Sequence, residues 1–82
     1  ETKKTDISLL DYDEDLFSQL KAWRRKIAQK KNVPSYIIFN DKTLKQIAAV
    51  QPKNNHELLS VSGIGQQKLK DYGEDILELL GH

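Results

Sequence analysis

The stretch "LLSVSGIGQQKLKDYG", residues 58–73, places two of the chain's four glycines on either side of one isoleucine. A short apolar run precedes this pair, Gly63 and Gly65, and a run with helical spacing follows it. Two interpretations fit this arrangement. The glycines either form a tight turn between two helices, or they allow the backbone to come close to a ligand such as a phosphate.

The residues after the glycine pair predict two more helices. The first covers residues 66–72, and Gly73 fits the left-handed position that commonly follows the end of a helix. The second covers residues 74–80. The side chains expected to face the core are Leu69, Tyr72, Ile76, Leu77, Leu79 and Leu80.

The residues before the glycine pair predict three helices, at 13–31, 41–50 and 55–60. The first has a narrow apolar stripe at i, i+4, i+7 and i+11, and Asp13 is placed to cap its start. This stripe consists of Leu16, Leu20, Trp23 and Ile27. Because Trp23 lies on the stripe, we interpret it as a core residue.

The segment "NVPSYIIFND", residues 32–41, interrupts the helical pattern. Pro34 favours extended backbone at the residue before it. A short strand, a buried loop and a single 3₁₀ turn are all compatible with the segment, and we favour an ordered, partly buried connector. We expect Ile37, Ile38 and Phe39 in the core. Tyr36 is either packed with its hydroxyl at the surface or exposed as a stacking platform for an unpaired base.

Five helices without a strand predict an all-α fold, a compact five-helix bundle. It would contain a helix-hairpin-helix-like turn at the glycine pair and a short 3₁₀ or extended connector after the first helix. At 82 residues, the chain is long enough for one small domain. We expect residues 1–10 to be a linker or loosely packed arm and residues 11–82 to form the domain.

Several functions find no support in the sequence. Cysteine is absent, so the chain has no disulfide framework and no thiolate metal site. No Gly-Lys-Ser/Thr phosphate loop and no HExxH helix occurs. We therefore expect no catalytic residue, metal or cofactor in this domain, and no transmembrane helix, since no run of about 18 apolar residues is present.

The charges are unevenly distributed along the chain. Residues 1–20 have a net charge of −4, residues 21–70 a net charge of +9, and residues 71–82 a net charge of −4. A basic centre of this kind attracts polyanions. The alternative is that these charges simply solvate the outer faces of helices.

The order of these motifs resembles the HRDC domain, the helicase-and-ribonuclease-D C-terminal module. The resemblance covers about residues 12–80 and rests on "VPSYIIFND" after a basic helix and "LLSVSGIGQQKL" about twenty residues later. It is closest to the version found in bacterial RecQ-type DNA helicases. It implies an auxiliary module that binds single-stranded or junction DNA weakly and assists substrate selection in recombination and repair. The parent chain would be an ATP-dependent helicase that moves in the 3′-to-5′ direction.

The nucleic-acid-binding residues expected from the charge pattern, the glycine turn and the resemblance are basic side chains, one tyrosine and two glycines. They are Lys21, Arg24, Arg25, Lys26, Lys30, Lys31, Tyr36, Lys42, Gly63, Gly65 and Lys68. The basic side chains would neutralise phosphates, and Tyr36 would stack on a nucleobase. The glycine turn would present backbone amides to a phosphate.

Two alternatives remain open from the sequence. The domain could instead dock on its own helicase core or on another repair protein, with little affinity for DNA. The same module also occurs in ribonuclease D, where it would help to hold RNA. We expect an isolated domain that is monomeric, makes no membrane contact, and works in the bacterial cytoplasm at the nucleoid.

Overall fold

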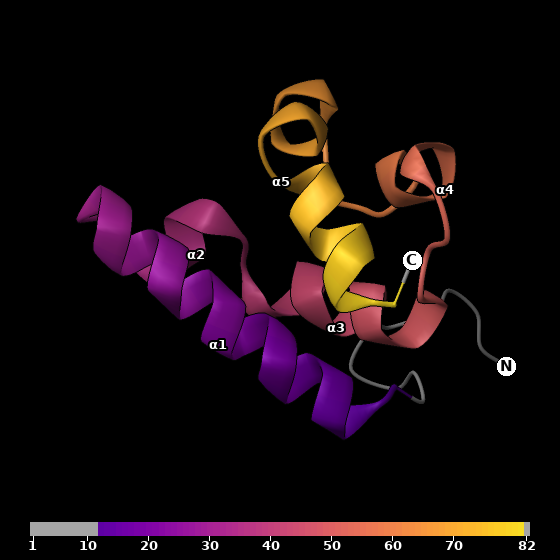
Figure 1. Ribbon diagram of the computed structural model, residues 1–82, viewed down its shortest axis with the longest axis horizontal. Helices are drawn as coiled ribbons and strands as arrows, with labels where there is room; N and C mark the ends of the chain where they lie inside the picture. Colours follow the sequence, from indigo (N-terminus) through magenta and orange to yellow (C-terminus); the bar gives the residue numbers. More distant parts are fainter. Residues whose placement is uncertain (1–11, 82) are drawn as a thin grey trace, which may run out of the picture.

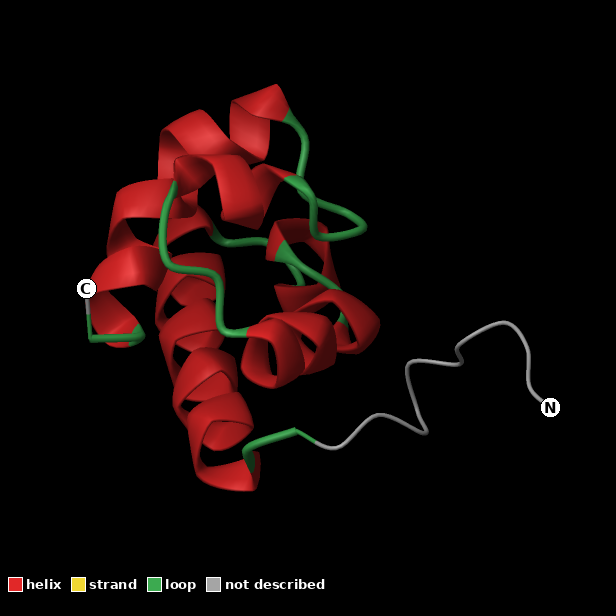
Figure 2. Cartoon of the chain, turned by 90° about the vertical axis from the view of Figure 1, so that its right-hand side faces the viewer, coloured by secondary structure: helices red, strands yellow, loops and turns green. Residues whose placement is uncertain are grey.

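The computed structural model describes residues 12–81, which form helices joined by short loops, with no strand in this range (Figures 1 and 2). The helices are α1 (Glu14–Lys31), α2 (Ser35–Ile38), α3 (Asp41–Val50), α4 (Asn55–Leu59) and α5 (Gln66–Leu79). The predicted all-α class with five helices is confirmed. None of these helices is long and apolar enough to cross a membrane. The arm expected at residues 1–10 lies outside the described residues, so its boundary stays a prediction.

The long helix α1 begins and ends at residues suited to those positions. The side chain of Asp13 accepts a hydrogen bond from the backbone N–H of Leu16 at 3.0 Å, as predicted for the N-cap. The helix ends at Asn32, whose left-handed backbone (φ 59°) is one that asparagine tolerates better than most residues. Figure 1 shows α1 along one side of the molecule, with α2 and α3 beside it.

The core lies between α1, α3 and the C-terminal half of the chain. Leu20, Leu44, Ile47 and Leu58 are completely buried. The predicted stripe of α1 faces this core, with Leu16 and Leu20 buried and Trp23 and Ile27 partly buried against it. Burial of such side chains is worth about 1.5–3 kcal/mol each, which makes this cluster the main stabilising feature of so small a domain.

The two helices predicted after the glycine turn are one continuous helix, α5, which runs through Gly73. The helix end predicted at Gly73 is therefore wrong. Gly73 is buried, and a Cβ atom there would lie 2.9 Å from Leu69 Cδ1 and 3.6 Å from Leu58 Cδ2. The lack of a side chain at Gly73 thus leaves room for the Leu69 side chain one turn earlier in α5, whereas the distance to Leu58 is an ordinary van der Waals contact. The left-handed glycine that follows the helix is Gly81, with φ +95°.

The segment expected to be a 3₁₀ or extended connector contains one helical turn, α2. The backbone N–H of Ile37 donates to Pro34 at 3.0 Å, and that of Phe39 donates to Ser35 at 3.4 Å. One turn has only one inward side, so Ile38 is buried whereas Ile37 is half exposed. The expectation that Ile37 lies in the core is thus wrong, and the expectation for Ile38 and Phe39 is confirmed.

Candidate nucleic-acid interface

Tyr36 is the one exposed aromatic residue among residues 12–81, with 68% of its surface accessible. It is the second residue of α2, and Ile37 beside it is 50% exposed. Pro34 sets the extended backbone that leads into this turn, with ψ 149°. An exposed ring on a short rigid element is the arrangement that stacking on an unpaired base requires.

Two basic side chains bind the end of α2. One comes from a helix that follows α2 in the sequence and the other from a helix that precedes it. Lys68 of α5 donates from Nζ to the backbone oxygen of Ile37 at 2.8 Å and also to that of Ile38. Arg24 of α1 donates from Nη1 to the backbone oxygen of Phe39 at 2.9 Å. The carbonyl groups at a helix C-terminus lack partners within the helix, and cations are favoured there. The two side chains therefore fix the element that presents Tyr36.

An aromatic cluster anchors the residue that follows α2. Phe39 stacks on Trp23 with ring centroids 6.0 Å apart, and the edge of Tyr72 meets both rings at 5.6 and 5.8 Å. Aromatic pairs at these separations are worth about 0.5–1.5 kcal/mol beyond their burial. The packing role expected for Trp23 is confirmed, and the cluster joins α1, α5 and the end of α2.

Arg24 and Lys68, both expected to bind phosphate, use their charges within the protein. Arg24 is only 11% exposed at its side chain, and its Nη1 also forms an ion pair with Asp41 at 2.8 Å. Lys68 Nζ lies 5.1 Å from the centre of the Phe39 ring in addition to its two carbonyl bonds. This geometry favours a positioning role for both residues over direct contact with a phosphate.

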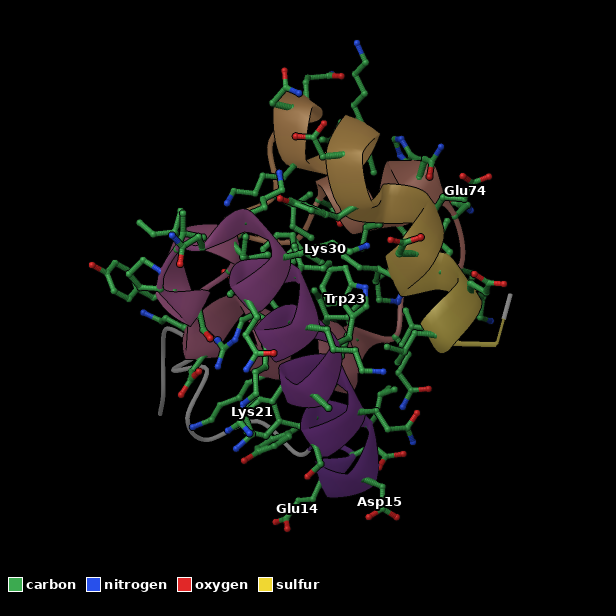
Figure 3. All side chains as sticks on the ribbon, turned by 60° about the vertical axis from the view of Figure 1, so that its left-hand side comes forward. Glu14, Asp15, Lys21, Trp23, Lys30 and Glu74 are labelled. Atoms are coloured by element: carbon green, nitrogen blue, oxygen red, sulfur yellow. The ribbon has the colours of Figure 1, made fainter. Side chains whose placement is uncertain are left out.

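Four of the expected phosphate-binding residues are exposed and, among residues 12–81, have neither a salt bridge nor an aromatic ring beneath their charged group. They are Arg25, Lys26, Lys30 and Lys42. The first three lie on α1, which packs against α2, and Lys42 lies in the first turn of α3 beside Asp41. Figure 3 shows Lys30 near one end of α1, with Glu14 and Asp15 at the other. The charges available to a polyanion therefore lie on α1 and at the start of α3, the helices that precede and follow α2 in the sequence.

The remaining two basic side chains of α1 lie over aromatic rings. Lys21 Nζ is 4.7 Å from the centre of the Phe17 ring, and Lys31 Nζ is 5.3 Å from the centre of the Tyr72 ring. Interaction with the Tyr72 hydroxyl raises the pKa of Lys31 above its ordinary value. Both residues are exposed and retain donors for a ligand.

The two glycines of the turn between α4 and α5 have different surroundings. Gly63 has φ +95°, and a Cβ atom there would lie 2.3 Å from Thr43 Oγ1, which itself donates to the backbone oxygen of Ser62 at 3.1 Å. Gly65 is the N-cap of α5, has extended backbone and leaves open space where a Cβ would lie. The start of α5 has neither a side-chain cap nor an acidic residue in its first turn.

A hollow of about 290 Å³ lies between the outer face of α1 and the start of α2. Its lining residues are Ser18, Lys21, Ala22, Arg24, Arg25 and Ser35. Ser18, Ala22 and Ser35 were missed by the sequence interpretation. The spacing of Ser18, Lys21, Ala22 and Arg25 on one helical face could have grouped four of the six residues, but no local signal brings Ser35 to them.

A second and larger hollow, of about 870 Å³, separates the start of α4 from the outer face of α5. We call it the α4–α5 groove. Its charged residues include Glu74, Asp75 and Glu78 together with Lys53 and Lys70, and its apolar residues are Leu69 and Leu77. Within residues 12–81, no three His, Asp or Glu side chains are placed to hold a metal ion.

Comparison with known proteins assigns the chain to a family, because the model of the HRDC domain matches residues 13–80. The chain belongs to the HRDC domain family. A solved structure, HRDC domain 3 of Deinococcus radiodurans RecQ, superposes with a TM-score of 0.78 at 33% identity, covering 82% of this chain and 88% of that one. The resemblance inferred from the glycine turn and the "VPSYIIFND" segment is confirmed, and so is the fold.

The HRDC domain has relatives in two kinds of DNA helicase. It is 46% identical to part of ATP-dependent DNA helicase UvrD2 of Mycobacterium tuberculosis, over 85% of this chain and 10% of the helicase. It is 43% identical to part of ATP-dependent DNA helicase RecQ of Haemophilus influenzae, over 85% of this chain and 11% of that protein. The chain thus spans about a tenth of the length of these helicases.

Proposed function

We propose that this HRDC domain is an auxiliary nucleic-acid-binding module of an ATP-dependent DNA helicase, with no catalytic activity of its own. It binds single-stranded or junction DNA weakly and helps to select the substrate in recombination and repair. The parent is a RecQ-type enzyme that moves in the 3′-to-5′ direction, or a UvrD2-type enzyme, since both kinds of relative share over 40% of the aligned residues. Its place is the bacterial cytoplasm, at the nucleoid.

The observation that carries this proposal is the presentation of Tyr36. An exposed aromatic ring is costly to leave in water, and here it is held on a turn whose end is fixed by Lys68 and Arg24. The ring is thus preorganised for a flat partner, which reduces the entropy lost on binding. Each base stacked on an aromatic ring is worth about 1–3 kcal/mol and imposes little sequence preference.

The exposed basic side chains of α1 and of the first turn of α3 supply the electrostatic part of binding. Arg25, Lys26, Lys30 and Lys42 neutralise phosphates and release counterions, so affinity falls as salt rises. The uncapped amides at the start of α5 add a contact to the phosphate backbone. Lys68 brings this end of α5 close to α2, since its ammonium group reaches the Ile37 carbonyl. Contacts of this kind position a strand without reading its sequence.

The test is the affinity of Tyr36→Ala for a fluorescent single-stranded oligonucleotide, measured by anisotropy at low salt. We expect a loss of about 1–3 kcal/mol in binding free energy, the range for removing one stacked base. Tyr36→Phe is the matched control, because it keeps the ring and removes only the hydroxyl, and it should bind like the parent domain. Equal affinity of Tyr36→Ala and the parent domain, with both folded, would remove Tyr36 from the interface.

A second candidate function, protein docking, is favoured by the α4–α5 groove. Glu74, Asp75 and Glu78 there form no salt bridge with any residue in the range 12–81, and Leu69 and Leu77 give the groove apolar surface. Such a groove suits a basic segment of the helicase core or of another repair protein. Under this alternative, exchanging Glu74 and Glu78 for lysine would abolish docking but leave the Tyr36 surface unchanged. The helicase relatives favour either function over a ribonuclease D parent.

A further inference from the structure

The hollow between α1 and α2 adjoins the residue that presents the exposed ring. Ser35 lines the hollow and immediately precedes Tyr36 in α2. Lys21 and Arg25 line it from α1, one helical turn apart, and both are exposed. The hollow and the Tyr36 ring are thus supplied in part by consecutive residues of α2.

The lining of the hollow has the chemistry of an anion site. Lys21, Arg24 and Arg25 are cationic, Ser18 and Ser35 offer hydroxyl groups, and no carboxylate lines it. Asp41 neutralises part of the Arg24 charge, so Lys21 and Arg25 provide the free charges. Arginine in particular matches the planar arrangement of phosphate oxygens through paired N–H donors.

The volume of the hollow suits a single phosphoryl group rather than a length of nucleic-acid strand. Its volume of about 290 Å³ is roughly ten times the volume that one water molecule occupies in the liquid, which accommodates a phosphoryl group with some water. An internal phosphodiester is attached to the strand on both sides, which restricts how far it can enter a hollow. A terminal phosphate has one covalent attachment and can enter. It also carries a charge of about −1.5 to −2 at pH 7, which exceeds the single charge of a diester.

We propose that this hollow binds the terminal phosphate monoester of a nucleic-acid strand whose terminal base stacks on Tyr36. The inference rests on the proposed function of the Tyr36 surface and adds a preference for phosphorylated strand ends. The 5′ and 3′ phosphate monoesters share this chemistry. The experiment determines which strand end places its base on Tyr36 and its phosphate in the hollow.

The test compares three single-stranded oligonucleotides of one sequence, each with the same internal fluorophore. One has a 5′-phosphate, one a 3′-phosphate, and one hydroxyl groups at both ends. We expect one phosphorylated form to bind about three- to tenfold more tightly than the hydroxyl form, as two partly exposed charge pairs would give. Equal affinity of all three would overturn the inference while leaving the proposed function intact. Failure of all three to bind would overturn both.

Substitutions of residues that line the hollow test whether the preference for a phosphorylated strand end arises there. Ala22→Met fills the hollow without changing charge, and methionine is a good helix former. Arg25→Gln removes a charge from the lining and covers the case in which Ala22→Met disturbs the fold. Both should reduce the preference for the phosphorylated end to less than about twofold. Lys26→Gln, the next residue but outside the lining, should weaken all three oligonucleotides equally and keep their ratio. A preference that survives in both lining variants would place the phosphate elsewhere.

Discussion

Arg24 and Arg25 are neighbours in sequence, yet their side chains do different things because an α-helix turns by about 100° per residue. Arg24 points toward the end of α2, where it binds the Phe39 carbonyl and Asp41. Arg25 points outward and forms no salt bridge with any residue in the range 12–81. A charge counted in the sequence is therefore not always a charge available to a ligand.

This difference predicts unequal effects of the same substitution. Arg24→Met should lower the free energy of unfolding by about 1–3 kcal/mol, because it removes a charge-assisted bond to a backbone carbonyl in a nearly buried position. Arg25→Met, at an exposed position, should change stability by less than about 0.5 kcal/mol. Urea denaturation followed by circular dichroism measures both. Similar losses for the two variants would mean that Arg24 does not hold α2.

At the scale of elements, the turn between α4 and α5 depends on one glycine more than on the other. Gly63 combines a left-handed backbone with close contact to Thr43 of α3, whereas Gly65 has an ordinary extended backbone and free space around it. The turn is thus fastened to α3 by the hydrogen bond that Thr43 Oγ1 donates to the Ser62 carbonyl, for which Gly63 leaves room. The start of α5 needs no glycine for steric reasons.

We expect Gly63→Ala to lower the free energy of unfolding by about 1–3 kcal/mol, since the added methyl group meets Thr43 Oγ1 and the backbone conformation disfavours it. Gly65→Ala should be within about 0.5 kcal/mol of the parent, as the weaker N-cap is offset by a less flexible unfolded chain. Thermal and urea denaturation of the pair tests this. A larger loss at Gly65 would contradict the account of the turn.

Local sequence patterns predicted some features of the helices correctly and missed others, and the reason is physical. The apolar stripe of α1 and the cap at Asp13 are local features, and both were predicted correctly. Gly73 was misassigned because glycine is common just after a helix end, and the sequence does not show that α5 continues through Gly73 with Leu69 packed against it. The half-exposed Ile37 was missed because an apolar run does not reveal that α2 is a single turn.

The candidate site was harder to predict from the sequence than the helices, because tertiary contacts assemble it. The sequence indicated Tyr36 and the basic residues, but it left the exposure of the ring open. It also could not show that Lys68, 30 residues beyond Ile38, holds the end of α2. The grouping of Ser35 with the outer face of α1 likewise arises only when the chain folds.

The whole molecule is electrically polarised. Exposed basic side chains lie along α1, whereas Glu74 and its acidic neighbours lie along α5, and Figure 3 shows Lys21 and Glu74 on opposite sides of the view. Such a molecule approaches a nucleic acid with its basic side foremost. The acidic C-terminal half of α5 would face away from the strand and leave the acidic end of the α4–α5 groove accessible.

The central claim is that the surface around α2 binds single-stranded DNA, and an NMR titration of the domain with a short oligonucleotide tests it most directly. At low salt we predict shifts in the backbone amides of Tyr36 and Ile37, in the Arg25–Lys30 part of α1, and at the start of α5. These shifts should weaken at moderate salt, because phosphate contacts release counterions. Amides at the acidic end of the α4–α5 groove, Glu74 to Glu78, should stay unchanged. Absence of shifts at low salt, or shifts confined to that groove, would contradict the account.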